Sequence, residues 1–270
     1  MKDYLYIDSS DDSSQARFKV SETSKIDALI EQKRFSDALR EVDNLLKSNS
    51  GWENWNYKGI ILDNLARYGE AVECFNNALG IEKNSDIELN KANCLYNWAK
   101  VTFFPEGDYD KALKLINCAL DAIPENIDPS EFHFLKAEIL EGQNNLVEAQ
   151  KSYLIAYKEF DKLNEFEYQT QYLNETSDTL INIVGSDFYS FTPQQGIIVD
   201  LVKDEENEHD SDAIAVIKDG KTVGYVANNP YTLIDEVKSA SDIKNIINPS
   251  QKAEILFIYL AEYVIAKLID

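Results

Sequence analysis

One acidic loop near the C-terminus of this 270-residue chain is dense in side chains that are able to do acid–base or metal chemistry. Residues 204–212 hold six carboxylates together with His209. Carboxylates at this density are able to bind a divalent cation, but the loop lacks the central Gly and the terminal Glu of a calcium-binding EF-hand loop. A solvated turn is therefore the better explanation, and no metal site is predicted.

The rest of the sequence offers little for catalysis. It contains no nucleophile elbow, phosphate-binding loop, zinc-protease motif or dinucleotide fingerprint. The other histidine, His133, falls in a helical pattern, where a packed role is favoured over a catalytic one. We therefore predict a protein that is not an enzyme and that carries no cofactor.

Cysteine usage and hydropathy indicate the compartment. The three cysteines form no C-x-x-C pair, and their odd number favours buried thiols in a reducing environment. The sequence has no apolar run of about 20 residues, the length needed to cross a bilayer, and its start lacks a signal-peptide pattern. We expect a cytoplasmic protein without membrane contact. The cysteines are Cys74, Cys94 and Cys118.

Charge restricts the class of partner. The formal net charge is −22 and the isoelectric point is about 4.4. Such a surface repels phosphate backbones at long range and attracts basic partners. A protein or peptide partner of basic character is therefore expected.

One helical register recurs four times in the first two thirds of the chain. A large side chain is followed by Ala three residues later, by a second large side chain four after that, and by a fourth apolar residue three further on. These offsets place all four side chains on one helix face. The central alanines are 33, 41 and 37 residues apart, which is the scale of a helical hairpin repeat. The copies are Phe35-Ala38-Val42-Leu45, Tyr68-Ala71-Phe75-Ala78, Tyr109-Ala112-Ile116-Ala119 and Leu146-Ala149-Tyr153-Ala156.

The second copy carries further residues of a known pattern. Trp55 and Gly59 precede its turn, and residues 67–71 read Arg-Tyr-Gly-Glu-Ala. In these positions the chain resembles the tetratricopeptide repeat family, which implies an α-solenoid with a concave peptide-binding groove. Copy three carries about two extra turns around residues 97–104. Residues 164–184 are expected to form a long helix that covers the last hairpin.

The family pattern maps a set of side chains to that groove. They are acidic with apolar members between, which suits a basic or amphipathic peptide. An ordinary solvated acidic surface explains the same residues equally well. The set consists of Glu53, Asn56, Ile60, Asp63 and Asn64 in copy two, and of Glu131, Phe134, Glu138 and Glu141 in copy four.

From about residue 188 the hydrophobic period changes from 3.6 to 2. Strands are expected at 197–202, 213–218, 221–226, 253–260 and 263–268, and a helix at 230–240. Asp219-Gly220 between two of these strands favours a two-residue type I′ hairpin. Short strands with one helix in about 80 residues suggest a small open β-barrel.

Residues 206–216, with the Val223-Gly224-Tyr225-Val226 strand behind them, are similar to the HIRAN domain, and the resemblance spans about 189–268. It implies recognition of a single-stranded DNA end by the loop, with Asn207 and Asp210 at matching positions and His209 in place of an aromatic residue. Lys221 is among the lysines that would contact phosphate, because residues 186–270 contain no arginine. Capping of a tight turn by Asn207 and Asp210 explains their identities equally well.

The sequence therefore predicts an α+β multidomain protein. Residues 1–18 are expected to be a flexible acidic N-terminus, residues 19–185 a tetratricopeptide-like array with its capping helix, and residues 188–270 a HIRAN-like β-barrel with one helix. The predicted function is that of a non-enzymatic adaptor that binds a protein or peptide through the groove. The alternative is a protein that binds single-stranded DNA ends in DNA repair or restriction.

Overall fold

The computed structural model describes residues 24–269, so the expected flexible segment 1–18 lies outside the described residues. The chain divides into two compact units with the boundary between Lys158 and Glu159. The first unit is helical, and the second contains one long helix and a β-barrel.

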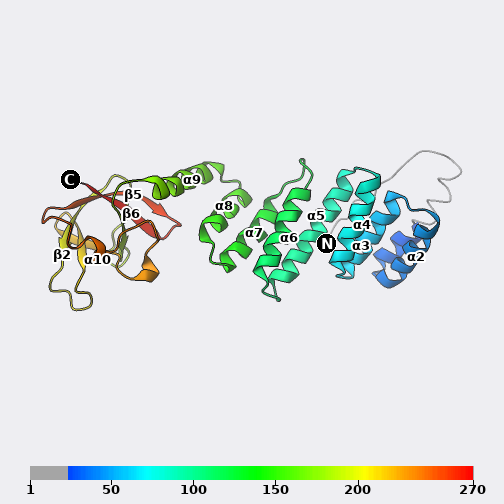
Figure 1. Cartoon of the computed structure of the whole chain (residues 1–270), viewed down its shortest axis with the longest axis horizontal. Helices are drawn as coiled ribbons and strands as arrows, with labels where there is room; N and C mark the ends of the chain where they lie inside the picture. Colours follow the sequence, from blue (N-terminus) through cyan, green and yellow to red (C-terminus); the bar gives the residue numbers. More distant parts are fainter. Residues whose placement is uncertain (1–23, 270) are drawn as a thin grey trace. The chain divides into compact units, whose positions relative to one another are not determined.

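The helical unit is a series of antiparallel hairpins that follow one another along the chain (Figure 1). Residues 24–31 are helical and pair with α2. Each of the four predicted registers begins at the first residue of a helix, which confirms the predicted hairpin array. The helices are α2 (Phe35–Ser48), α3 (Trp52–Asn64), α4 (Tyr68–Ile81), α5 (Ser85–Phe103), α6 (Tyr109–Ala122), α7 (Ser130–Gly142) and α8 (Leu146–Ala156).

Small residues of the register allow the helices to approach closely. Ala38, Ala71 and Ala112 have no exposed surface, as expected for positions where a second helix crosses. Gly59 on α3 faces Phe75 on α4, and a Cβ atom at Gly59 would lie 2.6 Å from that ring. A larger residue at position 59 would therefore collide with the Phe75 ring.

The turns inside the hairpins share one backbone conformation. The residue two positions before the second helix has a positive φ angle: 57° at Lys33, 57° at Ala66, 72° at Gly107 and 60° at Asn144. A left-handed residue after a helix stops it and reverses the chain. Only one of the four is Gly, so the packing of the two helices stabilises a conformation that the other three residue types disfavour.

Copy three departs from the regular pattern as expected. Its first helix, α5, has 19 residues, whereas α3 has 13. The extra turns end at Phe103, and residues 104–108 lead into α6.

The second unit differs from the prediction in its first elements. The expected helix over 164–184 is shorter, because α9 spans Phe160–Glu175 and is followed by strand β1 (Leu180–Val184). The polar run at 176–178 separates the two elements, and four of the five side chains of β1 are buried in the barrel. Periodicity over a short apolar run does not distinguish a buried strand from a helix. The predicted boundary between the array and the barrel therefore lies too late in the chain.

The barrel is closed rather than open, because β1 supplies the missing strand. Six antiparallel strands follow one another in the order β1-β4-β3-β2-β5-β6, and β6 pairs with β1. Asp219 and Gly220 in the β3–β4 turn both have positive φ angles, which confirms the predicted hairpin. The remaining strands are β2 (Ile198–Lys203), β3 (Ile214–Lys218), β4 (Lys221–Val226), β5 (Lys252–Tyr259) and β6 (Tyr263–Ile269).

The prediction of a helix at 230–240 is also wrong. Residues Pro230–Thr232 form a single 3₁₀ turn, and a short helix, α10, begins later at Ala240 and ends at Ile243. A capping box between Ser239 and Asp242 starts α10 at that point. Residues 235–237 form a turn, after which the Lys238 N–H donates to the Leu180 carbonyl of β1.

Candidate functional site

The structure separates the predicted groove residues of copy two into buried and exposed ones. Asn56, Ile60 and Asp63 are at most 8% exposed, so they do not line an open surface. The Nδ2 atom of Asn90 donates to Asn56 at 3.1 Å, and Asn97 donates to both carboxylate oxygens of Asp63 at 3.0 and 3.1 Å. Each pair joins residues 34 positions apart, which links α3 to α5 in the next repeat.

Those three assignments are therefore corrected. Asn90 and Asn97 of α5 hydrogen-bond to this face of α3, and its side chains are buried. The other two residues of the set remain at the surface: Glu53 is half-buried, and Asn64 is exposed and donates to the Ile60 carbonyl at 2.8 Å. The second copy consequently contributes little to an open groove.

The fourth copy presents an aromatic and acidic surface. Phe134 on α7 packs edge-on against Tyr153 and Tyr157 of α8, with ring centroids 5.6 and 6.1 Å apart. Glu141 accepts a hydrogen bond of 2.7 Å from the Tyr153 hydroxyl. Phe134 is 37% exposed and Tyr157 is 61% exposed. We call Phe134, Tyr153, Tyr157, Glu138 and Glu141 the aromatic–acidic patch.

The pKa of Tyr153 reports the electrostatics of this patch. Burial has the largest effect and raises this pKa. The negative charges of Glu141 and Glu138 raise the pKa of Tyr153 further because they repel the phenolate form. Both carboxylates therefore act on the same surface. Sequence reasoning missed Tyr153 and Tyr157 as surface residues, although their spacing of four on one helix is a signal for a shared face.

Glu131, also assigned to the groove, has a different partner. It accepts a hydrogen bond of 3.1 Å from the hydroxyl of Tyr96 on α5. Burial and this carboxylate together raise the pKa of Tyr96 to about 12. Glu131 thus connects α5 to α7.

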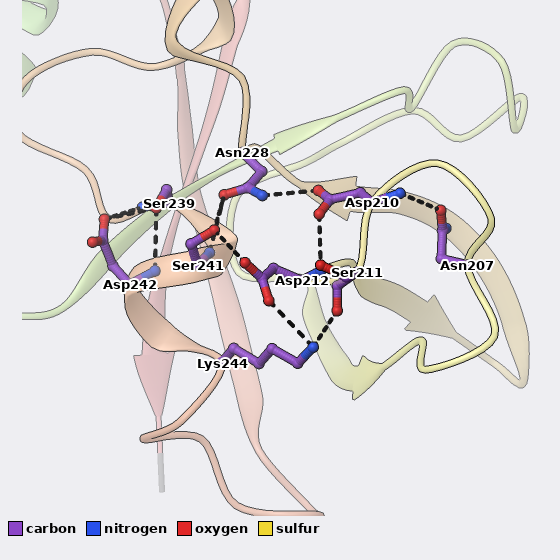
Figure 2. Close-up of polar contacts among 9 residues, drawn as sticks. All are labelled: Asn207, Asp210, Ser211, Asp212, Asn228, Ser239, Ser241, Asp242 and Lys244. Carbon is purple, nitrogen blue, oxygen red and sulfur yellow. Dashed lines mark hydrogen bonds and ion pairs between the residues drawn. The ribbon is translucent and has the colours of Figure 1, made fainter.

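In the barrel, the Asn207 side chain stabilises the acidic loop by hydrogen bonds with the loop itself (Figure 2). Its Oδ1 atom accepts from the backbone N–H groups of His209 and Asp210 at 3.0 and 3.1 Å. Its Nδ2 atom donates to Asp204 at 3.1 Å, and the Tyr225 hydroxyl donates to the same carboxylate oxygen at 2.9 Å. These two donors lower the pKa of Asp204. Asn207 and Tyr225 are therefore engaged inside the loop.

Asp210 fastens the loop to the strand and helix behind it (Figure 2). One carboxylate oxygen accepts from the Asp212 N–H at 2.8 Å, and the other accepts from Asn228 Nδ2 at 2.9 Å. Asn228 in turn accepts from the Ser241 N–H at 3.0 Å and from its hydroxyl at 2.8 Å. Both carboxylate oxygens of Asp210 and the side-chain amide of Asn228 are therefore already hydrogen-bonded within the protein.

Asp212 and Lys244 complete the contact between the loop and α10 (Figure 2). Lys244 donates to the Ser211 carbonyl and lies 3.3 Å from the Asp212 carboxylate. The Ser241 hydroxyl is also within 2.8 Å of Asp212, so its single hydrogen is shared between two acceptors. Ser241 and Lys244 lower the pKa of Asp212. Ser241 was not expected from the sequence, because α10 was not.

The remaining predicted ligand residues do not come together with this network. His209 is exposed at the tip of the loop. Lys221 begins β4 beside the Asp219-Gly220 turn, whereas the loop adjoins the other end of the β3–β4 hairpin. Four residues of extended strand separate Lys221 from Tyr225, which is about 13 Å.

The other residues considered for chemistry are placed as follows. His133 is half-buried, and burial lowers its pKa, which keeps the imidazole neutral. Cys74 and Cys94 are buried as expected, but Cys118 is exposed, which corrects its assignment. Within residues 24–269, no group of three His, Cys, Asp or Glu side chains forms a potential metal site. In the same part of the chain, no helix has the length and apolar character needed to span a membrane.

Comparison with known proteins gives the following picture. No family model and no curated protein matches the chain. A crystal structure of MamA is 15% identical over 52% of this chain and 77% of its own, with a TM-score of 0.37. The MamA RS-1 ArsTM double mutant is 17% identical over 58% and 84%, with a TM-score of 0.36. MamA 41-end from Desulfovibrio magneticus RS-1 is 18% identical over 55% and 94%, with a TM-score of 0.35. Similarity at this level does not extend to function.

Proposed function

We propose that this protein is an interaction scaffold that holds a basic segment of a partner protein on the aromatic–acidic patch of α7 and α8. The observation that carries the proposal is the exposure of Phe134 and Tyr157 beside Glu138 and Glu141. Exposed aromatic rings bind cationic side chains over their faces, and carboxylates nearby form ion pairs with the same cations. Arginine suits this combination best, because its planar group stacks and forms paired hydrogen bonds.

The overall charge of −22 supports a basic partner, because it accelerates the approach of cations. The acidic loop of the barrel does not favour a nucleic-acid strand. Asn207, Asp210 and Tyr225 are already hydrogen-bonded within the loop, and its surface carboxylates repel phosphate. The DNA-end hypothesis therefore gains no specific support from the geometry.

Binding of labelled peptides to the full chain tests the proposal. The probe is a 12-residue peptide in which Arg alternates with Leu, and the matched peptide carries Glu in place of Arg. We expect the basic peptide to bind with an anisotropy change and the acidic peptide not to bind. Glu138→Lys should weaken binding at least about 10-fold, because it replaces attraction with repulsion.

A matched control separates the local effect from the change in net charge. Glu73→Lys makes the same charge change at an exposed position of the helical unit, on α4, which is separated in the repeat order from α7 by α5 and α6. It should reduce affinity by no more than about twofold, because charges farther apart than about 8–10 Å are screened at ordinary salt. Equal binding of both peptides, or equal effects of the two variants, contradicts the proposal.

A further inference from the structure

A cavity of about 590 Å³ lies elsewhere on the helical unit, between α4, α5 and α6. Its volume is in the range of sites that hold a small ligand or a few side chains of a partner. Leu95 of α5 is buried at its base, whereas Cys118 of α6 is exposed. The apolar part of the lining consists of Val72, Leu79, Leu95, Ala122, Ile123 and Pro124.

Polar side chains share this lining and have no partners. Glu88, Asp121 and Glu125 contribute carboxylates, and Lys91 contributes one ammonium group. Among residues 24–269, none of these four side chains makes a hydrogen bond or an ion pair, whereas Lys58 on α3 and Lys151 on α8 are paired with carboxylates. The cavity therefore has an excess of two negative charges next to an apolar base.

The cavity does not coincide with the aromatic–acidic patch. Its walls are α4 and α6, the second helices of two successive hairpins, whereas the patch lies on the last hairpin. On α4 the lining residues run from Val72 to Leu79, seven residues apart, which corresponds to about 10 Å along the helix. The cavity is thus long enough for about two turns of a helical segment.

We infer that this cavity is a docking site for a short amphipathic segment of a partner protein, with a bulky apolar side chain inserted and Lys or Arg beside it. The apolar base takes the inserted side chain, as in helix-in-groove recognition. The basic residues pair with Glu88, Asp121 and Glu125, which make no ion pair within the described part of the chain. This inference is independent of the function proposed above, because it uses a different surface.

Cys118 provides a probe inside the cavity. It is the exposed cysteine, whereas Cys74 and Cys94 are buried, and burial raises the pKa of Cys74 to about 11. The chain has no other cysteine. A thiol reagent should therefore modify Cys118 first, and a segment docked in the cavity should protect it.

The experiment measures the rate at which Ellman's reagent modifies the full chain in the presence of synthetic peptides. One 12-residue helical peptide carries Leu at i and i+4 with Lys on both sides, a second carries Glu in place of Lys, and a third carries Lys without Leu. We expect the Leu–Lys peptide alone to slow the reaction, by about 10-fold at about ten times its Kd. The double variant Glu88→Lys/Asp121→Lys should lose this protection.

Control variants keep the result interpretable. Glu73→Lys/Glu167→Lys makes the same change in net charge at exposed positions outside the cavity lining and should retain protection. Ala122→Phe fills the cavity without altering charge and should abolish docking. Glu138→Lys in the aromatic–acidic patch should leave protection unchanged, which distinguishes this site from the proposed one.

Several outcomes overturn the inference. No protection by the Leu–Lys peptide, or equal protection of the wild type and the Glu88→Lys/Asp121→Lys variant, rules it out. Protection by octyl glucoside but not by the peptide assigns the cavity to a small amphiphile instead. Protection that increases with the concentration of the chain alone assigns it to a second copy of this protein.

Discussion

The role of Asp210 is the most direct point at which the two explanations of the barrel loop diverge. If its carboxylate holds the loop, Asp210→Ala removes the acceptors of the Asp212 N–H and of Asn228 Nδ2. A hydrogen bond to a charged acceptor contributes about 1.5–3 kcal/mol when buried, and Asp210 is half-exposed, so we assign about 1 kcal/mol to each. The expected loss of unfolding free energy is about 2 kcal/mol.

Two further variants calibrate this value. Asp210→Asn keeps an acceptor for the Asp212 N–H but places an amide NH₂ opposite Asn228, whose Oδ1 atom is held by Ser241. About half of the cost, roughly 1 kcal/mol, is expected. Glu208→Ala changes an exposed carboxylate of the same loop and should shift stability by less than about 0.5 kcal/mol.

The assay uses the distribution of tryptophans. All three, Trp52, Trp55 and Trp98, lie in the helical unit, so tryptophan fluorescence follows that unit alone. Far-UV circular dichroism follows both units. For a unit of about 110 residues, 2 kcal/mol corresponds to a decrease in Tm of about 8 °C. We expect this decrease in Tm for the unfolding transition of the barrel unit, which circular dichroism detects and tryptophan fluorescence does not.

The refuting result is specific. Asp210→Ala with an unchanged barrel transition would show that the carboxylate does not hold the loop. A salt-dependent titration with an oligonucleotide bearing a free 3′ end then tests the other explanation on the same proteins. Binding by the wild type that is lost in Asp210→Ala, with stability unchanged, would establish the DNA-end hypothesis.

Three other predictions follow from packing and charge. Gly59→Ala should lower the unfolding free energy of the helical unit by about 1–2 kcal/mol in urea, despite the better helix propensity of Ala, because its Cβ atom would collide with the Phe75 ring. Adding Phe75→Leu to Gly59→Ala should recover part of this loss. If the effects of the two substitutions on the unfolding free energy simply add, the contact is contradicted. Asn97→Ala should cost about 2 kcal/mol, measured by tryptophan fluorescence, because Asp63 loses donors in a buried site; a cost below about 0.5 kcal/mol would refute this. The Tyr225 hydroxyl donates to Asp204, which raises the pKa of Tyr225 from its ordinary value of about 10 to about 12. The contribution of this hydroxyl to stability is therefore fully present below about pH 10 and is lost as the pH rises to about 12. A ¹³C-tyrosine NMR titration, assigned with Tyr225→Phe, measures it, and a midpoint near 10 would contradict the bond.

The comparison of sequence and structure is most informative where the two disagree. Residues 180–184 read Leu-Ile-Asn-Ile-Val, and nothing local distinguishes a buried strand from a continuing helix. Their conformation depends on pairing with residues of β4 and β6 that lie more than 40 positions away in the chain. The same pairing closes the barrel. Similarly, Lys238, just before α10, is held by its contact with β1.

The candidate sites show the same division. The sequence placed Asn56, Ile60 and Asp63 on an open face, because the family pattern describes a single hairpin. Asn90 and Asn97 of the neighbouring α5 hydrogen-bond to that face, and only the stacking of repeats reveals these contacts. The sequence predicted three residues of the aromatic–acidic patch, namely Phe134, Glu138 and Glu141. It did not predict Tyr153 and Tyr157. Their contact joins two helices.

The sequence by itself determined the hairpin array, because small and large residues at offsets of 3, 4 and 3 specify one helix face, and it determined the β3–β4 hairpin through Asp219-Gly220. These are local properties that extend over one or two turns of chain. Only the tertiary structure decided that Asp210, Asn228 and Ser241 form one network, and that three helices line an open cavity whose lining includes Cys118. Contacts between distant segments arise from the packing of whole elements, which no short stretch of sequence encodes.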